Sequence, residues 1–235
     1  MQEDDPTGQG SHLPHRLEVL CRRALPRAGV DGAGVALVTR AGHRATVCAT
    51  DAVAARLEEA QFVLGEGPCV DASAGRSPVL LDDLLDLSRW TRARWPGFLE
   101  AAGEVGVRAV FAFPLRLGTV AFGALDLYRL TPGPLQADEL RTALLTADVA
   151  ALALLELREG KDLLRQAEDG AGEGAMTAFR YQVHGAAGMV KVQLGSTIEH
   201  ALMHLRAFAF AEDRSIDDIA KDVLEGRLSF TRENP

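Results

Sequence analysis

The chain has 235 residues, of which 47% are hydrophobic, and this is enough apolar material for one large domain or two small ones. The longest aliphatic run, 149–155, is far shorter than the roughly 18 to 20 residues that cross a bilayer, so a membrane-spanning chain is not expected. The formal net charge is −8, from 25 basic and 33 acidic residues, so any contact with nucleic acid requires a local patch rather than the overall field.

Two further features of the sequence bear on its compartment. The first five residues carry acids where a secretory signal carries bases, and no apolar segment follows them. The three cysteines, Cys21, Cys48 and Cys69, are an odd number, and their spacing suits neither a disulfide framework nor a C-x-x-C motif. We therefore expect a cytoplasmic protein with reduced thiols.

The N-terminal part of the sequence alternates short helical and β-type patterns. Residues 1–10 are polar, acidic and rich in Gly and Pro, and we expect them to form a disordered tail. Apolar residues recur at helical spacing over 13–25, and Pro26 is expected to end that helix. Two β-type runs, 34–39 and 44–49, flank a short turn with a glycine and are predicted to pair as an antiparallel hairpin.

A second helix is predicted between Asp51, a favourable N-cap residue, and Gly65, a favourable C-cap residue. Its expected apolar stripe comprises Val53, Leu57, Ala60 and Leu64. The segment 65–69 that follows has the sequence Gly-Glu-Gly-Pro-Cys and is expected to be a loop.

Three more β-type runs, 78–81, 107–114 and 119–128, complete this part of the chain. Between them, 88–103 is expected to be helical, either capped near Ser88 or restarted at Pro96. Five strands and three helices, with hairpins at both ends of the strand set, favour an α+β domain with a mostly antiparallel sheet over a doubly wound one.

A long helical pattern spans 135–168 and carries two neighbouring apolar stripes. The first stripe comprises Leu140, Leu144, Ala147, Ala151 and Leu154, and the second comprises Leu145, Val149 and Leu152. Two stripes make an apolar arc too broad for one contact. We expect one side to pack on the sheet domain and the other to pair with the same helix of a second subunit. The alternative is that both stripes are buried within one subunit.

The glycine-rich segment 169–175 interrupts this pattern and is the best candidate linker, since each glycine costs a helix roughly 1 kcal/mol relative to alanine. Beyond it, three short helices are predicted: one over 177–194, one opening with a capping box at 196–199, and one opening at Ser215. The predicted organisation is a tail at 1–10, a sheet domain at 11–134, a linking and dimerisation helix at 135–168, a linker at 169–175 and a small all-α bundle at 176–235.

The sequence contains none of the Walker, H-E-x-x-H, G-x-S-x-G or paired G-x-G-x-x-G motifs. We therefore expect no enzymatic activity, and nothing in the sequence requires a cofactor. His200 and His204 lie four residues apart on a predicted helix, but no further ligand is at suitable spacing, so they are interpreted as a solvated face and no metal site is expected. Cys69 is interpreted as a packed small residue, with a reactive thiol as the alternative.

The C-terminal helices resemble a known family. The residues that carry the resemblance are Ala186-Ala187-Gly188-Met189, Ala201-Leu202, Leu205-Arg206, Arg214-Ser215-Ile216 and Ile219-Ala220. Over about 179–230 they are similar to the ANTAR domain, a three-helix RNA-binding output module of bacterial signalling and antitermination proteins. The resemblance implies RNA with paired hairpin loops as the partner. Many members carry Lys where this chain has Ala187.

Seven side chains of the bundle are candidates for contact with RNA. Tyr181, His184 and Gln193 offer stacking or polar groups, and Arg180, Lys191, Arg206 and Arg214 offer phosphate or base contacts. Because residues 176–235 contain seven basic and eight acidic residues, nonspecific electrostatic binding of RNA would be weak. Other roles remain open: Arg206 could form a salt bridge with Glu199, and Tyr181 could pack on the linking helix.

The N-terminal half resembles a second family. Leu64-Gly65-Glu66-Gly67-Pro68-Cys69, followed by Pro78-Val79, is similar to GAF domains of the actinobacterial type that are fused to ANTAR. Members bind cyclic nucleotides, haem, bilins or other small molecules on one side of the sheet. Candidates for lining such a pocket are Cys69, Phe111, Phe113, Phe122 and Tyr128, with ordinary core packing as the alternative.

Together the two resemblances imply a dimeric regulator of transcript elongation, in which a GAF-like sensor acts on an ANTAR-like RNA-binding bundle by altering the pairing of helix 135–168. The principal alternative is a signalling module whose bundle binds a protein instead of RNA. A more distant alternative is a thiol reductase, because some GAF-fold enzymes reduce free methionine sulfoxide with several cysteines.

Overall fold

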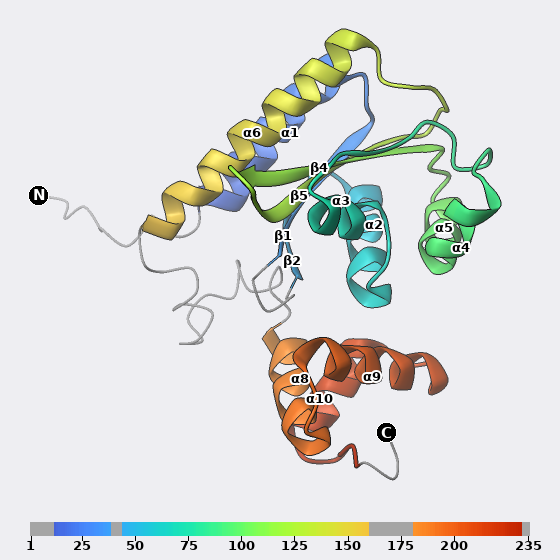
Figure 1. Ribbon diagram of the computed structural model, residues 1–235, viewed down its shortest axis with the longest axis vertical. Coiled ribbons are helices and arrows are strands. Elements are labelled where there is room, and N and C mark those ends of the chain that lie inside the picture. The colour runs from blue at the N-terminus through green and yellow to red at the C-terminus, as the bar shows by residue number, and fades with distance from the viewer. Residues whose placement is uncertain (1–11, 39–43, 160–180, 232–235) are drawn as a thin grey trace, which may run out of the picture.

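The structure is a computed structural model, and it describes residues 12–38, 44–159 and 181–231. In these ranges the chain forms a five-stranded sheet with helices on both faces, followed by a separate group of three helices (Figure 1). The expected tail, 1–10, and the expected linker, 169–175, lie outside the described residues. No helix of the described part is long and apolar enough to cross a membrane.

The sheet is antiparallel between all neighbouring strands and has the order β2-β1-β5-β4-β3. Its strands are β1 (Gly32–Val38), β2 (Arg44–Ala49), β3 (Val79–Leu81), β4 (Ala109–Leu117) and β5 (Val120–Arg129). The expected hairpin of β1 and β2 and the α+β class are confirmed. Strand β4 runs three residues beyond the expected end at Pro114, because its pairing with β5 continues past a register shift at Leu115.

Two layers of helices cover the sheet. Helices α1 (His12–Ala28) and α6 (Ala137–Glu159) lie side by side on one face, as Figure 1 shows. The other face is covered by α2 (Ala52–Leu64) and α3 (Pro68–Gly75), with α4 (Arg89–Arg94) and α5 (Pro96–Glu104) beyond them. The sheet therefore has one core with α1 and α6 and a second core with α2 and α5.

Three local expectations need correction. Helix α1 continues through Pro26 to Ala28, since a proline this close to the helix end removes a hydrogen bond from the last turn only. The expected loop 65–69 is cut short at Pro68, which begins α3, and proline is favoured at the first helical position. The stretch 88–103 forms two helices rather than one, because Ser88 caps α4 and the chain restarts at Pro96 as α5.

Helix α6 buries only one of its two expected stripes. The fully buried apolar residues of α6, which pack against α1 and the sheet, are small apart from the last: Ala143, Ala147, Ala150, Ala151 and Leu154. Leu144, which was assigned to the buried stripe, is exposed, as are all three members of the second stripe, Leu145, Val149 and Leu152. Within the described residues one subunit therefore does not bury both stripes, and an apolar face of α6 is exposed.

The C-terminal helices are α8 (Tyr181–Leu194), α9 (Ile198–Ala211) and α10 (Ile216–Leu224). Ser215 caps α10 as expected, accepting a hydrogen bond from the Asp218 N–H. The expected capping box at Ser196 is wrong, because Thr197 is the N-cap of α9 and accepts from the His200 N–H. The core of the bundle comprises Val183, Ala186, Ala187, Val190, Ala201, Leu202, Leu205, Ala209, Ile216, Ile219, Ala220, Val223 and Phe230.

Candidate functional site

Helix α2 turns two polar side chains, Glu58 and Gln61, toward the sheet, and both are buried. The ends of α2 are fixed by the Asp51 carboxylate, which accepts from the Ala54 N–H, and by Gly65 at a φ of 68°. Opposite Glu58 the sheet carries Gly34, where a Cβ would lie 2.3 Å from the Glu58 Oε1. Only glycine at that position lets the carboxylate rest against β1.

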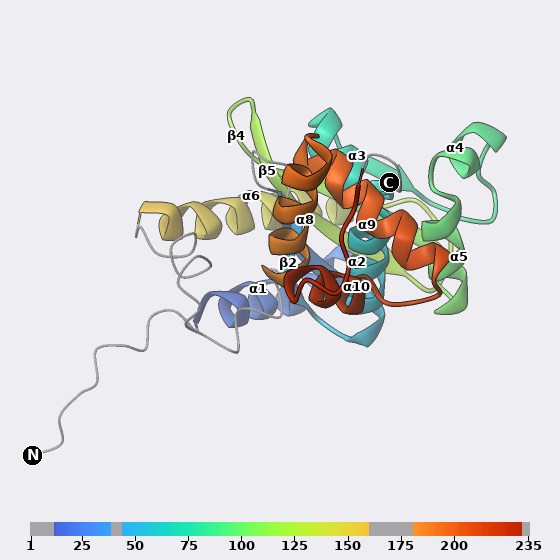
Figure 2. The same cartoon turned by 90° about the horizontal axis from the view of Figure 1, so that it is seen from below.

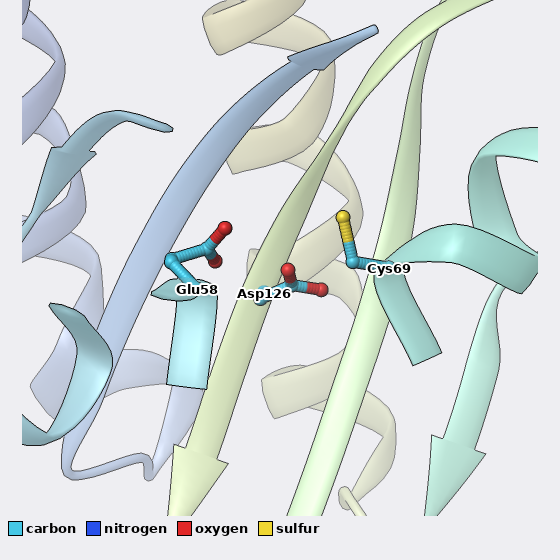
Figure 3. A group of neighbouring side chains, drawn as sticks. All are labelled: Glu58, Cys69 and Asp126. Atoms are coloured by element: carbon cyan, nitrogen blue, oxygen red, sulfur yellow. The ribbon is translucent and has the colours of Figure 1, made fainter. Parts of the chain in front are cut away.

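Glu58, Cys69 and Asp126 form a buried cluster between α2, α3 and β5. One potential ligand atom from each side chain lies within 4.8 Å of the other two, and the residues are 3%, 1% and 6% exposed. Figure 3 shows Asp126 rising from β5 between Glu58 on one side and Cys69 on the other. Two carboxylates and a thiol are groups that can bind a metal ion.

The Gln61 side chain connects two members of this cluster. Its Nε2 donates to the Asp126 Oδ2 at 3.1 Å, and its Oε1 accepts from the backbone N–H of Cys69 at 2.8 Å. Gly67 leaves room for this amide, since a Cβ there would lie 2.5 Å from the Gln61 Oε1. Cys69 is the second residue of α3. These contacts fix the Asp126 carboxylate and the backbone of Cys69.

Two small cavities flank the cluster, and Glu58 and Gln61 line both of them. Asp126 and Tyr128 add to the wall of the first cavity, and Phe62 and Cys69 to that of the second. Each has a volume of about 10 Å³, close to the least that holds one water molecule. In this conformation the cavities suit a water or an ion and not a nucleotide or a haem.

The five expected pocket residues fall into two groups. Cys69 and Tyr128 line the cavities, and the Tyr128 hydroxyl donates to the Asp51 Oδ1 at 2.9 Å. Burial, together with this hydrogen bond and the charge of Asp51, raises the pKa of Tyr128. Phe111, Phe113 and Phe122 instead pack in the core that includes residues of α1 and α6. For these three the structure shows core packing, which is the alternative given above.

The other two cysteines lie away from the cluster. Cys21 of α1 and Cys48 of β2 are buried in the core shared with α6 and lie close enough to hydrogen-bond each other. The contact with Cys48 lowers the pKa of the Cys21 thiol, whereas the same contact and burial raise that of Cys48. The three thiols of the chain therefore do not gather at one site.

Comparison with known proteins identifies the part of the chain that carries these features. Residues 12–155, which include the whole sheet and α1 to α5, match the GAF domain family. The chain belongs to the GAF domain family. The expectation of a GAF-like sensor domain is thereby confirmed, and the match extends into α6. No match was found among curated proteins.

Several solved structures are similar to this GAF domain. A domain of a putative two-component sensor histidine kinase from Sinorhizobium meliloti 1021 is 20% identical, with a TM-score of 0.49, over 61% of this chain and 91% of that one. The GAF domain region of a putative membrane protein from Geobacter sulfurreducens PCA is 18% identical, with a TM-score of 0.48, over 60% and 92%. The GAF-B domain of DevS from Mycobacterium smegmatis is 23% identical, with a TM-score of 0.45, over 63% and 97%.

The C-terminal bundle packs on the end of α2 in the GAF domain, as Figures 1 and 2 show from two directions. Phe62 belongs to the apolar core of the bundle, and its ring meets that of His184 edge-on at 5.8 Å between centroids. Arg206 Nη2 donates to the Phe62 carbonyl at 2.8 Å. That carbonyl is among the last of α2, where the helix dipole carries partial negative charge. Phe62 and Arg206 thus join the two parts of the chain.

The seven candidate RNA contacts have different surroundings. Arg180 and the Tyr181 side chain lie outside the described residues. Lys191 is exposed, whereas the Gln193 Oε1 accepts from the Phe230 N–H at 3.0 Å. His184 and Arg206 are at the contact with α2, and the structure gives Arg206 the Phe62 carbonyl as a partner. Arg214 pairs with Asp222 at 2.7 Å.

Arg214 shares Asp222 with a second arginine, Arg227. The hydrogen bonds from Arg214 and Arg227 hold the pKa of the Asp222 carboxyl below its ordinary value of 3.8. This exposed cluster ties the start of α10 to the segment after it and balances charge within the bundle. In the described part of the bundle, Lys191 and Lys221 are exposed cations for which the structure gives no such ion pair.

Proposed function

We propose that this protein is an RNA-binding regulator of transcript elongation, in which the GAF domain senses a signal and controls the C-terminal bundle. The resemblance of 179–230 to the ANTAR domain supports RNA as the ligand of the bundle. The observation that carries the regulatory part is the position of α2. Glu58 on α2 lines both cavities, and Phe62, one helical turn later, lies in the core of the bundle.

The contact with α2 gives a route from signal to output. In the docked arrangement the bundle presents Lys191 to solvent but uses His184 and Arg206 to hold the GAF domain. A ligand that favours a different position of α2 lowers the population of this docked state, in proportion to its preference for the other state. Release of the bundle then makes His184 and Arg206 available for RNA.

Pairing of two chains completes the proposal. The exposed stripe Leu145, Val149 and Leu152 recurs at intervals of four and three residues along α6, as in helices that pair through a seam. A second copy of α6 is its proposed partner. The resulting two-fold protein carries two bundles, which suits an RNA with two hairpin loops. Action on nascent transcripts places the protein in the cytoplasm.

A gel-shift titration of the full chain with an RNA that carries two adjacent hairpins tests the proposal. We expect Lys191→Ala to weaken binding several-fold and to reduce the slope of log affinity against log salt by about 1, as loss of one phosphate contact does. Lys221→Ala is the matched control, because it removes an exposed lysine of the same bundle that is not a candidate contact. Equal losses in both variants would contradict the proposal, as would the absence of any shift of the two-hairpin RNA by a chain whose bundle is released from α2.

A second candidate function is that of a protein-binding signalling module. It is favoured by two exposed apolar side chains of the bundle, Val192 and Phe210, at 80% and 87% exposure. The pairing of Arg214 and Arg227 with Asp222 also withdraws positive charge from RNA. This candidate predicts no RNA shift and loss of a protein complex on Phe210→Ser. We propose no catalytic role, because Cys21 and Cys48 are packed in the core with α6 and Cys69 lies in the cluster beneath α2.

A further inference from the structure

We propose that Glu58, Cys69 and Asp126 form a binding site for one divalent transition-metal ion of the zinc or iron(II) type. The three residues come from α2, α3 and β5, so that the site joins the sheet to the two helices that cover this face of it. The proposal stands apart from RNA binding, because every residue it uses lies in residues 12–155.

The geometry is close to what coordination requires. Bond lengths of about 2.0 to 2.3 Å from a tetrahedral ion place its ligand atoms roughly 3.5 Å apart. The donor atoms of Glu58, Cys69 and Asp126 already lie within 4.8 Å of one another. To enclose an ion, the donor atoms would have to approach one another by no more than about 1.3 Å, which is within the reach of side-chain rotation. The cavities beside the cluster leave room for a water molecule as the fourth ligand.

The chemistry of the donors selects the class of ion. The two carboxylates and the thiol are almost fully buried, so negative charges on all three would repel one another. A divalent cation between them offsets this repulsion. A thiolate ligand disfavours magnesium and calcium, which prefer oxygen, and favours zinc and iron(II).

The surroundings resemble those of a built metal site. Gln61 holds the Asp126 carboxylate with its Nε2 and the Cys69 backbone with its Oε1, and so fixes two of the three ligands from behind. Gly34 and Gly67 leave the space that Glu58 and Gln61 occupy. The adjoining cavities have the volume of a water or an ion, so the site is too small for an organic ligand in this conformation.

Cobalt(II) is the probe for the test, because thiolate coordination gives it an intense near-ultraviolet charge-transfer band. The full chain is freed of metal with a chelator and titrated with cobalt(II). We expect one ion per chain and a sulfur-to-cobalt band that Cys69→Ser abolishes. Cys48→Ser, which changes another buried thiol, is the matched control and is expected to keep the band. Zinc added after cobalt is expected to displace it and remove the band.

Gln61 is a positioning residue, and the variant Gln61→Ala distinguishes loss of metal affinity from a general loss of folded structure. Gln61→Ala is expected to keep the charge-transfer band but to weaken cobalt binding by about 10 to 100-fold, as loss of an outer-shell partner does. Asp126→Asn is expected to weaken binding at least as much, while far-ultraviolet circular dichroism confirms that each metal-free variant is folded. Absence of the band in the unaltered chain, or a band that survives Cys69→Ser, would overturn the proposal.

Discussion

Replacing Phe62 by alanine is expected to release the C-terminal bundle from the GAF domain. The Phe62 side chain is 5% exposed, and its ring lies in the apolar core of the bundle beside His184. Truncation of a buried phenylalanine to alanine costs about 3 to 5 kcal/mol. Because Phe62 also lines the second cavity, part of this cost falls on the GAF domain itself.

The part that falls on the contact shifts the equilibrium between docked and released bundle. If about 3 kcal/mol is lost there, the ratio of docked to released molecules falls by more than about 100-fold. The substitution leaves the Phe62 carbonyl in place as an acceptor for Arg206, so the loss comes from the apolar contact of the ring and not from this hydrogen bond. Small-angle X-ray scattering of the full chain measures the change, because release of the bundle increases the radius of gyration.

Phe210→Ala is the matched control for this experiment. It removes the same side chain from the same bundle, but Phe210 is 87% exposed and lies outside the bundle core. We expect the radius of gyration to rise for Phe62→Ala and to stay unchanged for Phe210→Ala. The reasoning would be refuted if Phe62→Ala left the scattering profile unchanged while circular dichroism showed a folded chain.

Two other predictions concern the dimer and the pH dependence of the bundle. The double change Leu145→Glu and Val149→Glu removes about 3 kcal/mol or more of apolar burial from an α6 pair, so sedimentation equilibrium should show a dimer dissociation constant raised by about 100-fold or more. Leu117 is 58% exposed, like Leu145, but lies on the β4–β5 hairpin, so Leu117→Glu should leave the dimer dissociation constant unchanged. An equal rise in the dissociation constant for this control and for the double variant would argue against pairing through α6. The lowered pKa of Asp222 implies a contribution to stability that is present above pH 3.8 and lost as the pH falls through the folded value. Asp222→Asn should therefore lower the melting temperature of the bundle at pH 7, and in acid the variant and the unaltered chain should have the same melting temperature. A difference in melting temperature that stays constant down to pH 2 would contradict this assignment.

Local sequence signals predict the framework of the fold well. Asp51 and Gly65 predict both ends of α2, Ser215 predicts the start of α10, and the β-type runs predict all five strands. These signals are strong because capping and strand alternation act between residues close in the sequence. The boundaries at Pro26 and Pro68 are less predictable, since proline is compatible with a helix at its first turn and near its end.

The candidate site is much harder to predict from sequence. Glu58 lies 11 residues from Cys69 and 68 from Asp126, and only the pairing of β5 with β1 beneath α2 brings the three together. One signal was available: Asp126 lies in the apolar middle of β5, whose other charged residue, Arg129, is at the end of the strand, and a carboxylate buried in such a place usually has a specific partner. Nothing in the helical pattern of α2 marks Glu58 or Gln61 as inward-facing, because an average amphipathic helix turns such residues to solvent.

The contact between the bundle and α2 has no sequence signature that we can name. Phe62 fits equally well into the core of the GAF domain, and Arg206 into a salt bridge on α9. Both side chains acquire their roles only when the C-terminal helices meet the end of α2. Arg214 is more predictable, since three acids, Asp217, Asp218 and Asp222, follow it within eight residues.

Ultraviolet crosslinking of the full chain to cellular RNA, followed by sequencing of the RNA and mapping of the crosslinked peptides, tests the central claim most directly. We predict recovery of transcripts that carry two adjacent hairpins, with crosslinks on peptides from α8 and α9 near Lys191 and Arg206. Recovery of no RNA above the background of an unrelated acidic protein, or crosslinks confined to residues 12–155, would contradict it.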